Sequence, residues 1–155
     1  TLQQTLLTDP HVAVCSDGSP TGFHPRGHGT FARIVETFVR ERGVLDLAEA
    51  VHRMSGLPAA LIPLPDRGVL APGNVADVLV FDPAAVHETA TWEAPQQLAE
   101  GFDLVLVNGQ VVRRDGAATG IRAGRVLRPD DPVSRSRRST EPPSTAPRGA
   151  PAAVP

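Results

Sequence analysis

The 155-residue sequence has no lysine, a single cysteine and no long apolar run, and these absences exclude several classes of protein. One cysteine cannot build a disulfide framework or a zinc finger with paired cysteines. No apolar stretch approaches the roughly 20 residues that a membrane-spanning helix needs. The formal net charge of −2, from 15 arginines and 17 acidic residues, supplies no strong field. We therefore expect neither nucleic acid nor a membrane as a partner.

The sequence also lacks an initiator methionine and the basic-then-apolar start of a secretory signal. It begins at Thr1, within a pattern typical of the end of an amphipathic helix with Leu2, Leu6 and Leu7 on one face. We therefore expect the chain to be part of a longer protein. Any signal would lie outside this chain, so a cytoplasmic location is assigned by default.

Composition divides the chain into three parts, residues 1–63, 64–128 and 129–155. The last part holds 7 of the 16 prolines together with many small and polar residues. Such a segment cannot bury enough apolar surface to offset the entropy lost on ordering, which predicts a disordered tail.

The first part opens with an apolar run, residues 12–15, that predicts a buried strand ending at Ser16-Asp17-Gly18. Asp17 would then follow the carboxyl end of a strand, where α/β folds place their chemistry. A loop rich in glycine, proline and histidine follows, over residues 18–29.

Apolar spacing then predicts three helices. They cover residues 30–42, 46–54 and 58–62. Thr30 is a suitable N-cap for the first of these helices, and Gly43 is placed to end it. Asp46 and Glu49 form a capping-box pattern at the start of the second helix. Pro58 suits the first turn of the third helix.

Residues 64–128 carry β signals instead. The predicted strands cover residues 76–81, 103–107 and 110–113. Asn108-Gly109 between the last two strands predicts a two-residue type I′ hairpin turn. The stretch 83–101, which contains Trp92, is predicted to be a long excursion with little regular structure.

Patterns for metal binding or catalysis are sparse when the residues are taken alone. Asp17, Cys15, His24 and His28 are candidates, but a closed zinc site needs three or four protein ligands. His24 and His28 are four residues apart, and Pro25 argues against their sharing one helix face. Asp17 could equally be a turn or capping residue, and Cys15 is interpreted as a small buried apolar residue. No serine stands in a nucleophile elbow.

Several motifs nevertheless occur in an order that resembles one enzyme family. The segments are Ser16-Asp17-Gly18, His24-Pro25-Arg26-Gly27-His28-Gly29-Thr30-Phe31, Glu49-Ala50-Val51, Met54-Ser55-Gly56-Leu57-Pro58-Ala59, the stretch 67–83, Val107-Asn108-Gly109, Thr119-Gly120 and Gly124-Arg125-Val126-Leu127-Arg128. Together they resemble the C-terminal portion of N-acyl-D-amino-acid deacylases, the D-aminoacylases of the metal-dependent amidohydrolase superfamily. The resemblance covers about residues 7–128.

The resemblance implies a divided α/β fold. Residues 1–63 would form the last strand and helices of a (β/α)₈ TIM-like barrel. Residues 64–128 would form part of a small β-sandwich, and residues 129–155 the disordered tail.

The resemblance also implies a function. The family's zinc-dependent enzymes hydrolyse the linear amide of an N-acyl-D-amino acid to a D-amino acid and a carboxylate. Asp17 matches the family's catalytic aspartate, which touches the metal, takes a proton from its water and later protonates the leaving amine. His24 and Arg26 would lie beside the site, as candidates for substrate contact or for anchoring the loop.

The family's remaining zinc ligands, which are a His-x-His pair, a bridging Cys or modified Lys and two later histidines, have no counterpart in this sequence. We therefore expect the chain alone to bind zinc weakly or not at all and to be inactive. Self-association through an exposed barrel edge is a further expectation. Two alternatives stay open: an amidohydrolase acting on a cyclic amide, a dipeptide or a deaminated ring, and a non-catalytic remnant acting through protein contacts.

Overall fold

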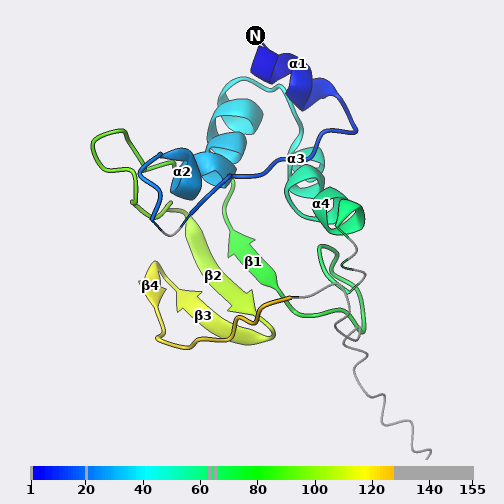
Figure 1. Cartoon of the computed structure of the whole chain (residues 1–155), viewed down its shortest axis with the longest axis vertical. Coiled ribbons are helices and arrows are strands. Elements are labelled where there is room, and N and C mark those ends of the chain that lie inside the picture. The colour runs from blue at the N-terminus through cyan, green and yellow to red at the C-terminus, as the bar shows by residue number, and fades with distance from the viewer. Residues whose placement is uncertain (1, 20, 63, 65, 128–155) are drawn as a thin grey trace, which may run out of the picture.

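The computed structural model describes residues 2–19, 21–62, 64 and 66–127, so the predicted tail over 129–155 lies outside the described residues. A helical layer lies above a small antiparallel sheet in the view of Figure 1. The helices are α1 (Leu2–Thr8), α2 (Arg26–Arg33), η1 (Ile34–Glu41), α3 (Leu47–Met54) and α4 (Gly56–Leu61). The strands are β1 (Val78–Phe81), β2 (Phe102–Val107), β3 (Gln110–Arg114) and β4 (Ala117–Ala118).

The first predicted helix is longer and differently wound than its spacing indicated. It begins at Arg26 rather than near Thr30, and the Thr30 hydroxyl donates to the Arg26 carbonyl at 2.7 Å from inside the helix. The helix continues from α2 into η1, a π-helix in which the Arg42 N–H reaches the Thr37 carbonyl at 3.0 Å. Gly43 follows with a φ of +57°, which confirms the predicted stop.

The cap of α3 is confirmed, because the Asp46 carboxylate accepts from the Glu49 N–H at 2.7 Å. The buried face of α3 differs from the predicted apolar stripe. Val51 is 39% exposed, whereas Ala50 and the charged Arg53 are buried. Helix α4 begins at Gly56, two residues before the predicted start.

The buried strand predicted at residues 12–15 is not formed. This segment is extended, but its recorded backbone hydrogen bond to another element joins the Val14 N–H to the Arg53 carbonyl at 3.0 Å. A strand requires a continuous ladder with a neighbouring strand, and no such neighbour is present among the described residues. Cys15 is exposed, so its interpretation as a buried residue was also wrong.

The β region confirms the hairpin. The strands pair in the order β1-β2-β3-β4, all antiparallel, and Asn108 and Gly109 have φ values of +49° and +77° as a type I′ turn requires. The short strand β4 was not predicted. It follows a second turn of the same kind, in which Asp115 and Gly116 have φ values of +48° and +78°.

The excursion between β1 and β2 is confirmed as largely irregular, with one isolated bridge between His87 and Glu100. It nevertheless packs into the core, because Val86 is fully buried against Ala32 and Val35 of the helical layer. Phe81 and Phe102 of the sheet pack against the same cluster. The helices and the sheet are therefore joined through one shared set of apolar contacts.

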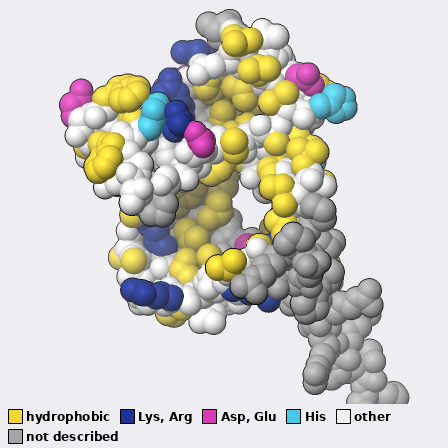
Figure 2. Space-filling model, viewed as in Figure 1, with side chains coloured by type: hydrophobic (Ala, Val, Ile, Leu, Met, Phe, Trp, Pro, Cys, Tyr) yellow, Lys and Arg dark blue, Asp and Glu magenta, His cyan; other side chains and the backbone are white. Residues whose placement is uncertain are grey.

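A second core cluster lies within the helical layer, between α1, η1 and α3, and consists of Leu7, Ile34, Phe38, Leu45 and Ala50. Hydrophobic side chains also remain on the surface over the helices and the sheet (Figure 2), including Leu61, Ile62 and Leu79, each more than half exposed. No helix within the described ranges is both long enough and apolar enough to cross a membrane.

Candidate functional site

Asp17 and Arg26 form an ion pair at the two ends of the glycine-rich loop. The Arg26 Nη2 lies 2.6 Å from the Asp17 Oδ2. The Asp17 side chain is 77% exposed and the Arg26 side chain 48% exposed. Asp17 has a φ of +48°, in the left-handed region that few residues other than glycine and asparagine adopt readily. The carboxylate is therefore held in a defined place while it remains open to solvent.

The backbone of this loop closes tightly behind the pair. A Cβ on Gly18 would lie 3.1 Å from the Gly27 carbonyl oxygen, so the two ends of the loop are almost in contact. The Ser16 hydroxyl accepts from the Gly18 N–H at 3.2 Å and shapes the turn that carries Asp17. Small residues at both ends allow Asp17 and Arg26 to approach each other.

Arg53 of α3 anchors the segment that leads to Asp17. It is 2% exposed, and its guanidinium donates to the carbonyls of Asp9 and Val12. Its Nε donates to the Glu49 carboxylate at 2.6 Å, so the buried charge is paired. Sequence reasoning missed this residue. The Glu49–Arg53 spacing of i, i+4 signalled an ion pair, but not the burial of the arginine or its backbone partners.

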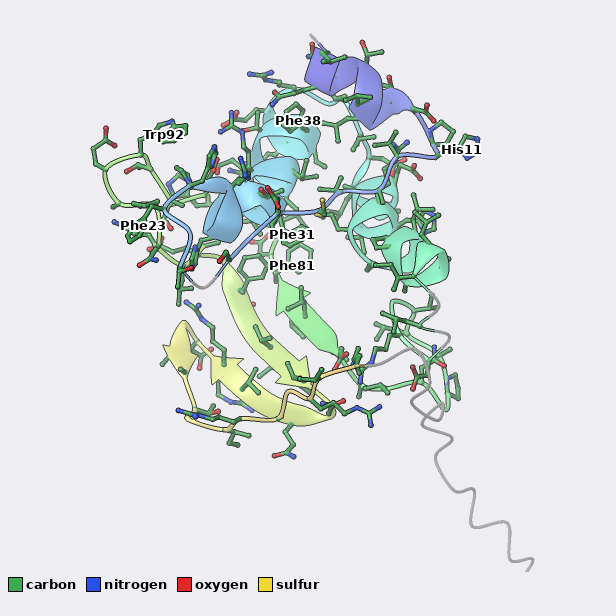
Figure 3. The ribbon with its side chains drawn as sticks, in the orientation of Figure 1. His11, Phe23, Phe31, Phe38, Phe81 and Trp92 are labelled. Carbon is green, nitrogen blue, oxygen red and sulfur yellow. The ribbon has the colours of Figure 1, made fainter. Side chains whose placement is uncertain are left out.

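His24 lies between the ion pair and the excursion from the sheet. Its Nδ1 accepts from the Arg26 N–H at 3.1 Å. Its ring centroid lies 4.5 Å from that of Trp92, with the ring planes inclined at 60°. Figure 3 shows the loop that carries Trp92 extending beside the start of the helical layer, next to Phe23. The Gln96 amide also donates to the Gly22 carbonyl at 3.4 Å.

The structure thus brings Asp17, His24 and Arg26 into one connected set, and it adds Trp92. His28 lies within α2, and its Nδ1 is buried without a hydrogen-bond partner. Within the described ranges, no group of three or more His, Cys, Asp or Glu side chains is placed to hold a metal ion. Since a zinc site needs three or four ligands, the residues described here do not form one by themselves.

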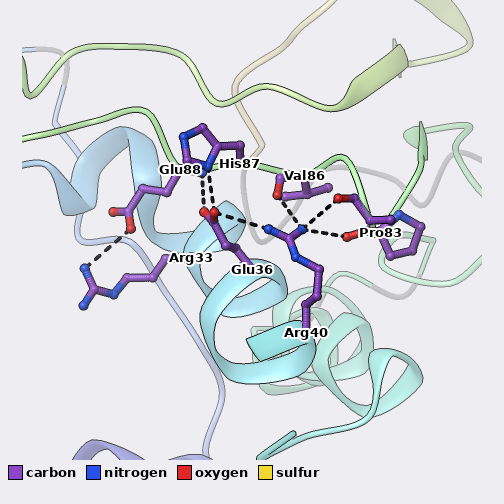
Figure 4. A network of polar contacts seen from close by, with 8 residues as sticks. Arg33, Glu36, Arg40, Pro83, Val86, His87 and Glu88 are labelled. Carbon is purple, nitrogen blue, oxygen red and sulfur yellow. Dashed lines mark hydrogen bonds and ion pairs between the residues drawn. The ribbon is translucent and has the colours of Figure 1, made fainter. Parts of the chain in front are cut away.

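A second polar cluster, the Glu36 network, fixes the base of the excursion to η1 (Figure 4). The Glu36 carboxylate accepts from the Glu88 N–H at 2.7 Å, lies 2.6 Å from His87 Nδ1 and pairs with Arg40 at 3.2 Å. Arg40 donates to three carbonyls of the excursion, those of Pro83, Ala84 and Val86. These bonds satisfy backbone groups that lack a sheet partner.

The two carboxyls of this network are shifted in opposite directions. Burial raises the pKa of Glu36, but the hydrogen bonds from Glu88 and His87 and the charges of His87 and Arg40 outweigh it and hold the pKa below its ordinary value. Burial raises the pKa of Glu88 above its ordinary value, and the nearby Glu36 charge adds to the effect while Arg33 opposes it. The network therefore stabilises one ionised carboxylate at the expense of the other.

Comparisons with known proteins agree with the motif order. The model described as "Amidohydrolase family" matches residues 2–113. N-acyl-D-aspartate deacylase of Alcaligenes xylosoxydans xylosoxydans is 44% identical over 137 residues, which cover 86% of this chain and 27% of that protein. The chain therefore spans about a quarter of the length of this relative.

Two solved structures have the same fold over the matched part. A crystal structure of D-aminoacylase superposes with a TM-score of 0.76 at 44% identity, over 80% of this chain and 27% of that one. N-acyl-D-glutamate deacylase from Bordetella bronchiseptica superposes with a TM-score of 0.71 at 40% identity, over 86% and 27%. That protein was solved with zinc and a phosphonate inhibitor that mimics the tetrahedral intermediate of the reaction.

Proposed function

Because this chain belongs to the amidohydrolase family, we propose that it supplies one part of the active site of a hydrolase that cleaves the amide of N-acyl-D-amino acids. The observation that carries the proposal is the Asp17–Arg26 pair, in which an exposed carboxylate is held by the loop motif that resembles the deacylases. The similarity to N-acyl-D-aspartate deacylase and to D-aminoacylase supports the substrate class.

The architecture that we propose for the whole protein is a (β/α)₈ barrel with a small β-sandwich. In it, residues 1–63 complete the barrel and residues 64–128 complete the sandwich. The extended segment 12–19 would then gain the neighbouring strand that the described residues do not supply. The shared core around Val86 would hold the two parts together.

In the proposed reaction Asp17 moves protons. Its carboxylate takes a proton from the water that attacks the amide carbonyl and returns one to the departing amine nitrogen. A carboxylate suits both steps because it accepts and donates through the same oxygen. The 77% exposure of the side chain leaves it accessible to a substrate.

Arg26 is proposed to bind the free carboxylate of the substrate. A guanidinium matches a carboxylate through two parallel N–H donors, and Arg26 is half-exposed beside Asp17. His24 fixes the Arg26 backbone through its Nδ1 and is proposed to anchor the loop. Together they would orient the amide of the substrate toward Asp17.

Zinc is the cofactor that we propose for the whole protein. When bound, it lowers the pKa of a water ligand toward about 7 and polarises the substrate carbonyl. Asp17 is the ligand that this chain would contribute. The remaining donors would come from outside the described residues, among which no three candidate ligands gather.

A chimera tests the proposal. Residues 2–127 replace the aligned segment of D-aminoacylase, and hydrolysis of an N-acetyl-D-amino acid is measured in the presence of zinc. We expect the chimera to be active and the Asp17→Asn substitution to lower kcat by about 10²–10⁴-fold, the usual contribution of a general acid–base group.

Asp103→Asn is the matched control, because Asp103 is an exposed aspartate on β2. It should leave kcat unchanged. Full activity in the Asp17→Asn chimera would overturn the assignment of Asp17. Turnover of a cyclic amide in place of the N-acetyl-D-amino acid would overturn the substrate class.

A further inference from the structure

The excursion over residues 83–101 is attached to the rest of the molecule at two places. Its base is held by the Glu36 network and by the burial of Val86. Its outer part reaches the glycine-rich loop, where Trp92 meets the His24 ring and Gln96 bonds the Gly22 carbonyl. The excursion therefore connects the sheet to the loop that carries the candidate site.

Trp92 is not held in place by burial. Its side chain is 71% exposed, whereas the nearby Val86 and Ala90 of the same excursion are buried. An indole that stays on the surface contributes little to a core, so its tilted contact with His24 is the feature that distinguishes it. Figure 3 places the Trp92 side chain on the loop that flanks the start of the helical layer.

A continuous series of contacts leads from Trp92 to Asp17. The indole lies against the His24 ring, the His24 Nδ1 accepts from the Arg26 N–H, and the Arg26 guanidinium pairs with Asp17. Rotation of the His24 ring would break its bond to Arg26, because only one orientation points Nδ1 at that N–H. The indole face restricts this rotation.

We propose that Trp92 is a positioning residue for the candidate site, acting through His24 on the Arg26 backbone and on the Asp17–Arg26 pair. The catalytic meaning of this role rests on the proposed function, but the positioning itself is a property of this chain. The excursion of the β region thereby becomes part of the site. Trp92 itself need touch neither the substrate nor a metal.

Nuclear magnetic resonance of the 155-residue chain tests the proposal. In Trp92→Ala we expect the ring-current shift of the His24 ring protons to be lost and the Arg26 amide resonance to move. Trp92→Phe keeps an aromatic face and should restore both signals in part. Leu98→Ala, at another exposed apolar residue of the same excursion, should leave both unchanged.

Fluorescence gives a second measurement that does not alter Trp92. Trp92 is the only tryptophan and the chain has no tyrosine, so the intrinsic emission arises almost wholly from this residue. His24→Ala should raise the emission intensity, because it removes the imidazole that quenches the indole. His11→Ala is the matched control, since His11 is exposed and lies far from Trp92 in Figure 3.

Unchanged His24 and Arg26 signals in a folded Trp92→Ala chain would overturn the positioning role, and so would equal emission in His24→Ala and His11→Ala. Either result beside an active chimera leaves the proposed function standing. Shifted signals beside an inactive chimera overturn the proposed function and leave the positioning intact. The melting curve followed by circular dichroism confirms that each variant is folded.

Discussion

Two ion-pair clusters hold the loops of this protein, and they are built in opposite ways. The Glu36 network is largely shielded from solvent, with the Glu36 side chain 14% exposed and Arg40 bonded to three backbone carbonyls. The Asp17–Arg26 pair is open, with its side chains 77% and 48% exposed. The first fixes a backbone that has no sheet partner, and the second presents charged groups to solvent.

This difference separates structural from functional use of the same residue types. A shielded carboxylate with several donors is committed to the fold, because removal of any partner leaves a polar group unsatisfied. An exposed pair contributes little to stability and can exchange its partner for a ligand. Substitutions at the two clusters should therefore act on different properties of the protein.

The largest effect is expected at Gly101, where the excursion returns to the sheet. Gly101 has a φ of +85°, and a Cβ there would overlap the Ala85 carbonyl and lie 2.6 Å from the Val86 Cα. Gly101→Ala should cost about 1–3 kcal/mol of unfolding free energy from overpacking, in addition to about 1–2 kcal/mol of left-handed strain. Urea denaturation followed by circular dichroism measures the loss.

Gly120→Ala is the control for strain alone, since Gly120 has a φ of +80° with open space around it. The difference between the two variants isolates the close approach of the excursion. Equal losses would show that the base of the excursion is not tightly packed, and the contrast between the two loops would weaken.

The next largest effect is expected at Arg40. Arg40→Ala removes the donor to the Pro83, Ala84 and Val86 carbonyls and should cost about 1–3 kcal/mol of unfolding free energy. Arg122→Ala, at an exposed arginine of the segment after β4, should change it by less than about 0.5 kcal/mol. Similar values for both variants would mean that solvent replaces the Arg40 bonds at no cost.

Sequence reasoning succeeded where the signal lies between near neighbours. The Asn108-Gly109 turn, the Asp46 cap and the Gly43 stop each depend on the conformation of one or two residues and their adjacent backbone. Such features are encoded locally, and the structure confirms them. The excursion was likewise predicted from its composition, although its buried Val86 was not.

Sequence reasoning failed where a feature depends on distant partners. The segment 12–15 has the composition of a strand, but a strand exists only with a ladder partner. Arg40 bonds carbonyls more than 40 residues away, and Trp92 meets His24 across 68 residues of sequence (92 − 24). Side-chain bonds to backbone carbonyls leave no residue pattern, because every residue has a carbonyl.

Acid should distinguish the two carboxyls of the Glu36 network. The pKa of Glu36 lies below its ordinary value of 4.5, so its contribution to stability is present above that value and is lost as pH falls through the lowered pKa. The pKa of Glu88 is raised, so its contribution is present below 4.5 and is lost as pH rises through the raised pKa.

Urea midpoints measured from about pH 3 to 7 test these signs. Glu36→Gln should reduce the loss of stability toward acid, and Glu88→Gln should reduce the loss that appears as pH rises above 4.5. The two variants are matched, because each replaces a glutamate of the same network by its neutral isostere. Changes of the same sign in both would contradict the assigned pKa directions.

The smallest effect on stability is expected at Asp17. Asparagine adopts the left-handed φ of +48° readily, and an exposed ion pair is worth about 0–1 kcal/mol. Asp17→Asn should therefore change the unfolding free energy by less than about 1 kcal/mol. Asp46→Ala, which removes the helix cap of α3, should cost about 0.5–2 kcal/mol. If Asp17→Asn costs more than this loss of a cap, Asp17 holds the loop together, and the Asp17–Arg26 pair is structural like the Glu36 network.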